Sequence, residues 1–326
     1  MVLTTGIGSM PGTSSFEATA VISGELSLPH LPELPQRGPG ADLIGRTAAL
    51  VESVATDFSV DTVPTGWRLS DRPGGVGRRA LSFLGEDLDV AEERYGGQPG
   101  PFKLQLAGPW TMLASLENRS GQPLLSDPGI VREYAAALLL AATAHLSDVA
   151  RRLPDRELWL QLDEPLLPVV LGGGIRRASK WSALPPVPVA EGRALLEPLA
   201  QLDHSLLHCC ARFPFEVAGD FSGVSLDLLR YRDEETDHGV GETVESGRTL
   251  VAGVVPSLGV EHLPPGAAAA NGYDHLQSLW SRTGLVGASL RDTVISPTCG
   301  LAGATPAGVR ASLDAAKEVA HRIETT

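Results

Sequence analysis

The chain has 326 residues, a formal net charge of −13 and an isoelectric point near 5.1. This acidity argues against a nucleic-acid-binding protein, because phosphate backbones attract basic surfaces and no basic run here is longer than a pair. Hydrophobic residues make up 43% of the chain and the mean hydropathy is close to zero, so the chain can bury a large core. We expect a globular protein with a single domain over residues 1–326.

Targeting and redox signals point to the cytoplasm. The first residues, "MVLTTGIGSMPG", contain neither a basic region nor a long apolar run, so we expect no secretory signal. No stretch reaches the roughly 20 apolar residues of a membrane span, and we expect no membrane contact. Three cysteines in a chain of this length do not form a disulfide framework. We therefore expect a cytoplasmic protein.

Short apolar runs alternate with helical patterns along the chain. Runs rich in Val, Leu or Ile predict strands over 3–10, 58–64, 102–108, 157–165, 204–210, 223–229, 249–256 and 292–300. Helical patterns predict helices over 41–57, 85–95, 127–153, 190–202, 232–247, 273–283 and 305–323. Eight strands alternating with helices indicate an α/β fold of the (β/α)8 TIM-barrel type.

A doubly wound sheet is the alternative, since it also alternates strands and helices. Such a sheet usually carries a glycine-rich phosphate loop after its first strand. Here "GIGSMPG" lacks that spacing, because Pro11 interrupts it. The pattern therefore favours the barrel.

Proline and glycine mark the predicted loops. "LSLPHLPELPQRGPG" at 26–40 and "SALPPVPV" at 182–189 are rich in proline, which removes backbone donors, so we expect neither to be a central strand. Both would be long strand-to-helix loops, which cover the face of a barrel where active sites lie. "SDRPGGVGRR" at 70–79 matches no nucleotide fingerprint, and we expect a flexible loop there.

The three cysteines lie in "SLLHCC" at 205–210 and "SPTCG" at 296–300. In an extended strand His208 and Cys210 point to one face and Cys209 to the other. Barrel closure would bring the strand ends with Cys299 and Asp227 to the same ring. These His, Cys and Asp side chains form a plausible tetrahedral set for zinc, and sulfur ligands favour zinc over magnesium or calcium.

A second interpretation of these residues is packing. A buried cysteine is often a small apolar side chain, and a histidine among apolar neighbours is often a core residue. The His-x-Cys spacing also lacks the paired Cys-x-x-Cys of a zinc finger. Cys209, on the opposite face, is expected to be packing in either case.

Four motifs in one order carry a family resemblance. They are "TTGIGSMPG" near the start, "QLDEPLL" at 161–167, "HCC" at 208–210, and "SPTCGL" at 296–301 before an alanine-rich helix. In this order they resemble the catalytic half of cobalamin-independent methionine synthase. The resemblance implies a zinc-dependent methyl transfer to the sulfur of homocysteine on a (β/α)8 barrel, which forms methionine.

The resemblance also implies roles for individual residues. His208, Cys210 and Cys299 match zinc ligands of the family, and Asp227 stands where the family has a glutamate as fourth ligand. Asp163 matches the aspartate that holds the amino group of homocysteine, and Glu164 beside it is a second candidate for the catalytic site. Ile7, Gly8 and Ser9 match the segment that binds the carboxylate end of the substrate with backbone donors and a hydroxyl.

Departures from the family concern the methyl donor. The Ile-Gly-Ser part of the first motif begins at residue 7, so we expect only the catalytic barrel and not the family's other barrel. Ser115 stands where the family has a tryptophan against the folate, and Trp110 is out of register. The local sequence "TGWRLSDRPG" also lacks the family's Arg-Cys dipeptide. The donor is therefore either folate or a corrinoid protein, as in short forms of the family.

Three alternative functions follow from the same residues. The chain could be another zinc methyltransferase of the uroporphyrinogen decarboxylase-like barrels that acts on a different small-molecule thiol. It could be a metal-dependent hydrolase with a zinc-activated water, although that chemistry calls for a general base beside the metal. It could also be a non-catalytic zinc-binding barrel, in which the metal serves stability alone.

Overall fold

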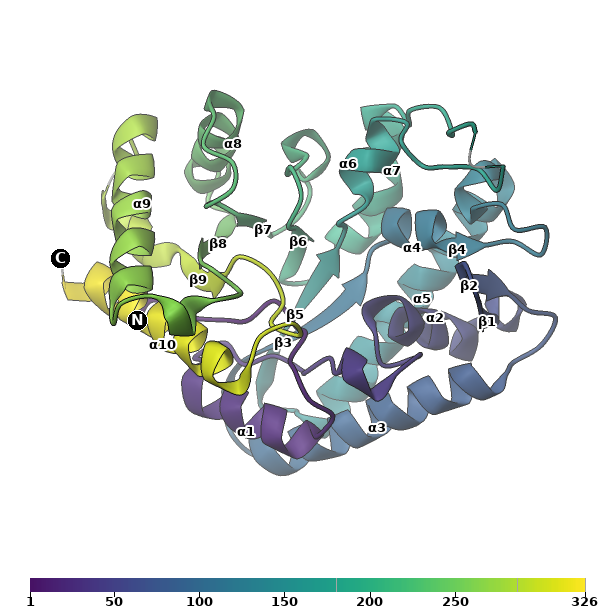
Figure 1. The fold of residues 1–326 in the computed structure, drawn as a ribbon, viewed down its shortest axis with the longest axis horizontal. Helices are drawn as coiled ribbons and strands as arrows, with labels where there is room; N and C mark the ends of the chain where they lie inside the picture. The colour runs from purple at the N-terminus through teal and green to yellow at the C-terminus, as the bar shows by residue number, and fades with distance from the viewer. Residues whose placement is uncertain (180, 286, 326) are drawn as a thin grey trace.

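The computed structural model describes residues 1–179, 181–285 and 287–325. Its centre is a parallel sheet of six strands in the order β3-β5-β6-β7-β8-β9 (Figure 1). The strands are β3 (Gly100–Ala107), β5 (Arg156–Asp163), β6 (Ser205–Cys209), β7 (Gly223–Asp227), β8 (Thr249–Val255) and β9 (Val294–Pro297). Six of the eight predicted strands are thereby confirmed.

Helices wrap the outside of this sheet (Figure 1). They are α1 (Ser15–Glu25), α2 (Leu43–Val54), α3 (Gly75–Tyr95), α4 (Pro109–Ser115), α5 (Pro128–Arg152), α6 (Leu167–Leu171), α7 (Val189–Ala200), α8 (Glu234–Glu245), α9 (Ala267–Thr283) and α10 (Pro306–Thr325). All seven predicted helices are present, whereas α1, α4 and α6 were not predicted. Within the described residues no helix has the length and apolar character needed to cross a bilayer.

The prediction of a flexible loop over 70–79 is wrong in its second half. Helix α3 begins at Gly75, ten residues before the predicted start, and Gly74 is its N-cap. Glycine lowers helix propensity by about 1 kcal/mol per residue, but the long apolar face of α3 outweighs that cost. The loop at 182–189 is confirmed, because α7 begins only at Val189.

Two extended segments lie between β9 and β3, the edge strands of the sheet. Residues 3–5 run along β9, where Thr5 N donates to Ile295 O at 2.9 Å and Ile295 N donates to Leu3 O at 2.8 Å. Residues 28–31 come next, with Leu28 N donating to Thr4 O at 2.9 Å and Leu31 N to Lys103 O at 3.0 Å. Isolated bridges therefore connect β9 to β3 through these segments, and the sheet is curled.

This arrangement corrects two predictions. The run at 58–64 does not join the main sheet: β1 (Val60–Val63) pairs antiparallel with β2 (Gly66–Leu69), and β4 (Leu116–Glu117) completes a separate three-stranded sheet. The position beside β3 belongs to part of the proline-rich segment that was predicted to be a loop. Its prolines are tolerated because the N–H groups that meet neighbouring segments belong to Leu28, Leu31 and Glu33.

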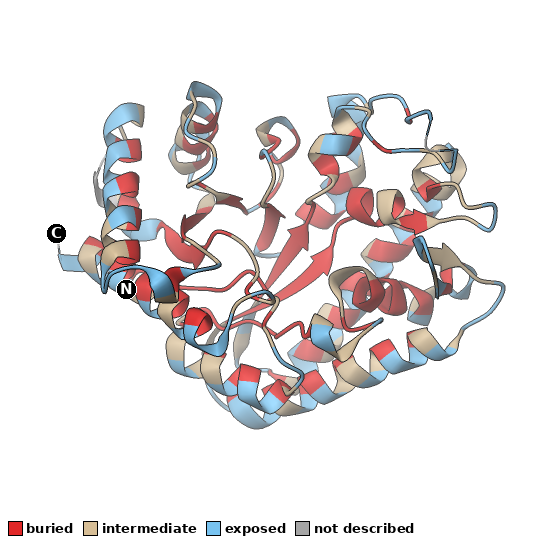
Figure 2. Cartoon of the chain, viewed as in Figure 1, coloured by how far each residue is buried: buried red, intermediate tan, exposed pale blue. Residues whose placement is uncertain are grey.

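The inner face of the curled sheet changes from apolar to polar along the strands. Near the strand starts lies a small buried cluster made of Leu28, Trp159, Leu206, Val251 and Val294, with Leu3 packed against it. Side chains alternate along a strand, so the next inward positions two residues on are His30, Gln161, His208, Gly253 and Ser296. Figure 2 shows that these strands are buried over most of their length. The polar end of the interior therefore lies at the carboxyl ends of the strands.

Candidate functional site

Asp163 and His208 are neighbours at the carboxyl ends of β5 and β6. The strands pair in register there, and both side chains are buried, with exposed fractions of 6% and 3%. His208 Nδ1 lies 2.9 Å from Ser225 Oγ and 3.1 Å from Ser225 O. Ser225 thus holds the imidazole ring through Nδ1, which leaves Nε2 available to a ligand.

Cys299 follows β9 and meets the residues at the end of β6. A hydrogen bond from the Cys210 side chain, and then one involving His208, lower the pKa of the Cys299 thiol to about 4. The same contact with Cys299 raises the pKa of Cys210, and burial raises it further. The structure thus brings together His208, Cys210 and Cys299, three of the four predicted zinc ligands.

Asp227, the fourth predicted ligand, turns toward its own loop. Its Oδ1 accepts hydrogen bonds from Leu229 N at 2.9 Å and Arg230 N at 3.1 Å. Burial raises the pKa of Asp227, and the nearby charge of Cys299 adds to that shift. The carboxylate is therefore close to the thiols, but one of its oxygens already caps the backbone after β7.

The donor set fits zinc in its chemistry more closely than in its present spacing. Two sulfurs and one imidazole, from the ends of β6 and β9, are ligands that zinc prefers. Yet no group of three or more His, Cys, Asp or Glu side chains in residues 1–179, 181–285 and 287–325 could hold a metal ion as the side chains stand.

Residues on the outer face of the same strand ends have structural contacts. Cys209 is buried in the core, and burial raises the pKa of its thiol to about 12. Glu164 Oε1 accepts from Trp110 N at 2.9 Å, and Glu164 Oε2 accepts from the N–H and hydroxyl of Thr111 at 2.7 Å. The structure places Glu164 as a cap of α4, on the side of β5 away from Asp163, whereas the sequence suggested a place in the catalytic site.

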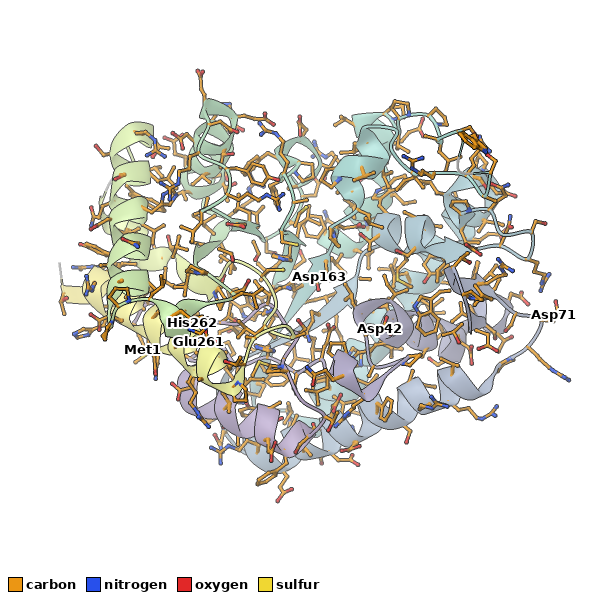
Figure 3. The ribbon with its side chains drawn as sticks, in the orientation of Figure 1. Met1, Asp42, Asp71, Asp163, Glu261 and His262 are labelled. Carbon is orange, nitrogen blue, oxygen red and sulfur yellow. The ribbon has the colours of Figure 1, made fainter. Side chains whose placement is uncertain are left out.

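Asp163 belongs to a buried polar network that the sequence analysis did not identify. Gln161 Nε2 donates to Asp163 Oδ1 at 2.7 Å and to Ile7 O at 2.8 Å. Lys103 Nζ donates to Gln161 Oε1 at 2.5 Å and to Ile7 O at 3.1 Å. Figure 3 shows Asp163 in the middle of the molecule. Alternating polar residues in the apolar runs "FKLQLAG" and "LWLQLDEP" were the signal for this network.

Glu33 is a further buried carboxylate close enough to Asp163 to feel its charge. It lies in the segment beside Ser9, is only 5% exposed, and its Oε1 has no hydrogen-bond partner within the described residues. Burial raises its pKa to about 7, the charge of Arg46 opposes this shift, and the charge of Asp163 adds to it. Burial likewise raises the pKa of Asp163 to about 6. Both carboxyls are therefore poised to ionise near neutral pH.

The segment Ile7 to Ser9 presents backbone donors next to these carboxyls. The carbonyl of Ile7 accepts from both Lys103 and Gln161, but no hydrogen bond in the described part of the chain uses the N–H groups of residues 7–9. Gly8 has a φ of 153°, and a β-carbon there would stand 2.9 Å from the Gln105 side chain. Glycine is thus required for this segment to pack against β3.

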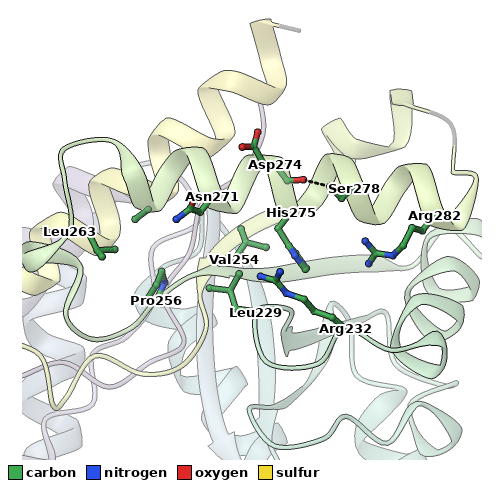
Figure 4. Close-up of a pocket in the computed structure, with 11 residues that line it drawn as sticks. Leu229, Arg232, Val254, Pro256, Leu263, Asn271, Asp274, His275, Ser278 and Arg282 are labelled. Atoms are coloured by element: carbon green, nitrogen blue, oxygen red, sulfur yellow. Dashed lines mark hydrogen bonds between the residues drawn. The ribbon is translucent and has the colours of Figure 1, made fainter.

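Figure 4 shows a separate pocket, of about 490 Å³. It lies between α9 and the loop after β7, and among its lining residues are Arg232, His275 and Arg282. Arg282 is paired with Asp237 at 2.6 Å, and burial lowers the pKa of His275 to about 4. No predicted site residue lines this pocket.

Solved structures show the same fold. A B12-independent methionine synthase from Shewanella sp. W3-18-1, in complex with selenomethionine, matches with a TM-score of 0.61 over 100% of this chain and 98% of that chain, at 14% identity. A methyltransferase from Methanosarcina mazei matches with a TM-score of 0.54 over 96% and 93%, also at 14% identity. The chain shares the fold of these two proteins. No family model and no curated protein matches the sequence.

Proposed function

We propose that this chain is a methyltransferase that activates a small-molecule thiol, homocysteine, on zinc and converts it to methionine. The proposal includes a single (β/α)8 barrel, in which the segments at residues 3–5 and 28–31 take the places of two strands. The observation that carries it is the meeting of His208, Cys210 and Cys299 from two distant strand ends. The fold shared with a methionine synthase supports the same conclusion.

The neighbouring polar groups suit the amino-acid end of homocysteine. Asp163 and Glu33 offer carboxylates to an ammonium, a charge-assisted pair that fixes orientation. The N–H groups of residues 7–9, with the Ser9 hydroxyl, offer donors to a carboxylate. The Shewanella enzyme was solved with selenomethionine, an amino acid of the product's shape. These contacts would direct the substrate sulfur toward Cys210 and Cys299.

The reaction joins the substrate sulfur to a methyl carbon. The thiol loses its proton, a C–S bond forms, and the bond between the methyl group and its donor breaks, with the electron pair leaving on the donor. Zinc, when bound, would stabilise the thiolate at neutral pH, where a free thiol with a pKa near 8.5 is mostly protonated. His208, Cys210 and Cys299 would hold the metal, and Asp227 is the remaining candidate for a fourth protein ligand.

The methyl donor is either a folate or a corrinoid. Trp110 cannot stack on a folate as it stands, because its ring is buried and its Nε1 donates to Gly192 O at 2.9 Å. Ser115, at the end of α4, offers no aromatic surface. Both features favour a corrinoid donor, as the departures in sequence also do.

The experiment compares Cys210→Ser with Cys209→Ser. Zinc content and methylation of homocysteine are measured for each, with methylcobalamin and methyltetrahydrofolate offered in parallel. We expect Cys210→Ser to lose zinc and activity, and Cys209→Ser to keep both at some cost in stability. Full zinc occupancy in Cys210→Ser would refute the proposed metal site.

The same assay separates the alternatives. Activity with other thiols but not homocysteine would indicate another zinc methyltransferase of the uroporphyrinogen decarboxylase-like barrels. Bound zinc without methylation of any thiol would leave a hydrolase or a zinc-stabilised binding protein. In the latter case, removing zinc would unfold the chain, whereas a catalytic zinc should leave most of the fold intact.

A further inference from the structure

Lys103 is a fully buried lysine in the centre of the sheet. Its exposed fraction is 0%, and within residues 1–179, 181–285 and 287–325 its ammonium donates only to neutral groups, the Ile7 carbonyl and the Gln161 side chain. Burying a charged amine costs several kcal/mol unless hydrogen bonds compensate. An apolar side chain would fill this place at less cost, so the amine calls for a functional reason.

The amine determines how the Gln161 amide is oriented. A lysine ammonium only donates hydrogen bonds, so Gln161 must turn its oxygen to Lys103 and its NH₂ group away from it. That NH₂ group then donates to Asp163 Oδ1 and to Ile7 O. Without the ammonium, Gln161 could flip and present its oxygen to the Asp163 carboxylate, which would repel it.

The same network leaves one oxygen of Asp163 for a ligand. Oδ1 is occupied by Gln161, and no hydrogen bond to Oδ2 occurs in the described part of the chain. Lys103 and Gln161 also share the Ile7 carbonyl, which holds the segment whose N–H groups remain free. The buried amine of Lys103 therefore orients both the Asp163 carboxylate and the segment at residues 7–9 that carries the backbone donors.

We propose that Lys103 is a positioning residue that, through Gln161, orients Asp163 to receive the ammonium group of the substrate. This inference rests on the proposed function, because it assigns the ammonium of that substrate to Asp163. Burial lowers the pKa of Lys103 to about 8, and the charges of Asp163 and Glu33 oppose the shift. The amine is therefore largely protonated at neutral pH, as its role as a donor requires.

The test measures ligand binding to the zinc-loaded full chain by calorimetry. The ligands are homocysteine and 4-sulfanylbutanoate, which has the same thiol and carboxylate but lacks the ammonium. The wild type should prefer homocysteine. In Lys103→Met, we expect the dissociation constant for homocysteine to rise about tenfold or more, the loss of one charge-assisted contact, while that for the analogue changes little. Zinc content should be unchanged.

Two further variants keep the test decisive. Gln161→Met removes the amide that connects Lys103 to Asp163 but leaves the lysine in place. It therefore tests the inference even if Lys103→Met does not fold. The double variant should lose no more preference for homocysteine than the larger of the two single losses, because both act on one network. Lys317→Met is the control, since Lys317 lies on α10 and pairs with Asp314 at 3.0 Å, far along the chain from the network.

The outcomes separate the two proposals. If the variants fold and keep the full preference for homocysteine, or weaken both ligands equally, Lys103 does not position Asp163 and the inference is overturned. If the wild type shows no preference for homocysteine over the analogue, the ammonium site itself is refuted, and the inference falls with it.

Discussion

Gly300 lies against Ser9, so that a β-carbon at position 300 would stand only 2.1 Å from the Ser9 hydroxyl oxygen. Leu301 N also donates to Ser9 O at 2.8 Å. The segment after Cys299 is thus packed directly on the segment that offers backbone donors. The two motifs, far apart in sequence, form one surface beside the candidate metal ligands.

Gly300→Ala should therefore disturb substrate binding through Ser9. The added methyl group must displace the hydroxyl or the backbone, and we expect the dissociation constant for homocysteine to rise about tenfold, near 1.4 kcal/mol. The control is Gly303→Ala, where a β-carbon would meet only Leu258 Cδ2 at an ordinary 3.6 Å. Binding by calorimetry and melting temperature check both. Equal dissociation constants and melting temperatures in the two variants would contradict a close contact between Gly300 and Ser9.

Glu33 should make the protein less stable as the pH rises. Its folded-state pKa of about 7 is above the ordinary value of 4.5. Between pH 4.5 and pH 7 the folded state therefore binds more protons than the unfolded state. The stabilisation is complete below about pH 4.5 and is lost as the pH rises through 7. The pKa values of Asp163 and Glu164 are raised as well, and both groups are present in the wild type and in a variant that changes Glu33 alone.

Glu33→Gln tests this directly by chemical unfolding at pH 5 and pH 8. We expect the free energy of unfolding to depend less on pH in the variant, and the variant to be more stable than the wild type at pH 8, by on the order of 1 to 3 kcal/mol. Glu245→Gln, at an exposed position on α8, should follow the wild type. Loss of stability in Glu33→Gln at pH 8 would mean that Arg46 pairs with an ionised Glu33.

Glu164→Gln should affect stability rather than chemistry. The amide retains one acceptor but turns its NH₂ group toward backbone donors, leaving α4 with an unsatisfied N–H at a cost of about 1 to 3 kcal/mol. Zinc content and the methylation rate should remain near the wild type. Glu191→Gln, in the exposed first turn of α7, is the matched control. A loss of rate larger than the loss of stability explains would restore Glu164 as a catalytic residue.

The sequence predicts the six regular strands because each is short, apolar and bounded by turn residues. It also predicts the faces of His208, Cys209 and Cys210, since alternation in a strand depends only on local geometry. The segment at 28–31 could not be predicted in this way. Its hydrogen bonds go to residues that are distant in the chain, and its prolines are compatible with a strand position only because the donors fall between them.

The direction of individual side chains at the strand ends was also beyond prediction from the sequence. Asp163 and Glu164 are adjacent acids, and only the fold shows that one points into the ring and the other caps a helix. In the sequence, Lys103 is the one charged residue of the apolar run at 102–108. The role of Lys103 depends on its hydrogen bond to Gln161, and the alternation of side chains along a strand does not by itself predict that contact.

Asp227→Asn tests whether this residue is a zinc ligand. Asparagine keeps an Oδ1 acceptor for Leu229 N and Arg230 N, so the loop should hold. Because a catalytic zinc site commonly has three protein ligands and one exchangeable position, we expect the variant to retain one zinc per chain after dialysis, by elemental analysis. Asp233→Asn, whose carboxylate caps α8, is the control. Zinc loss as complete as that expected of Cys210→Ser would instead make Asp227 the fourth ligand, with its Oδ1 contacts rearranged around the metal.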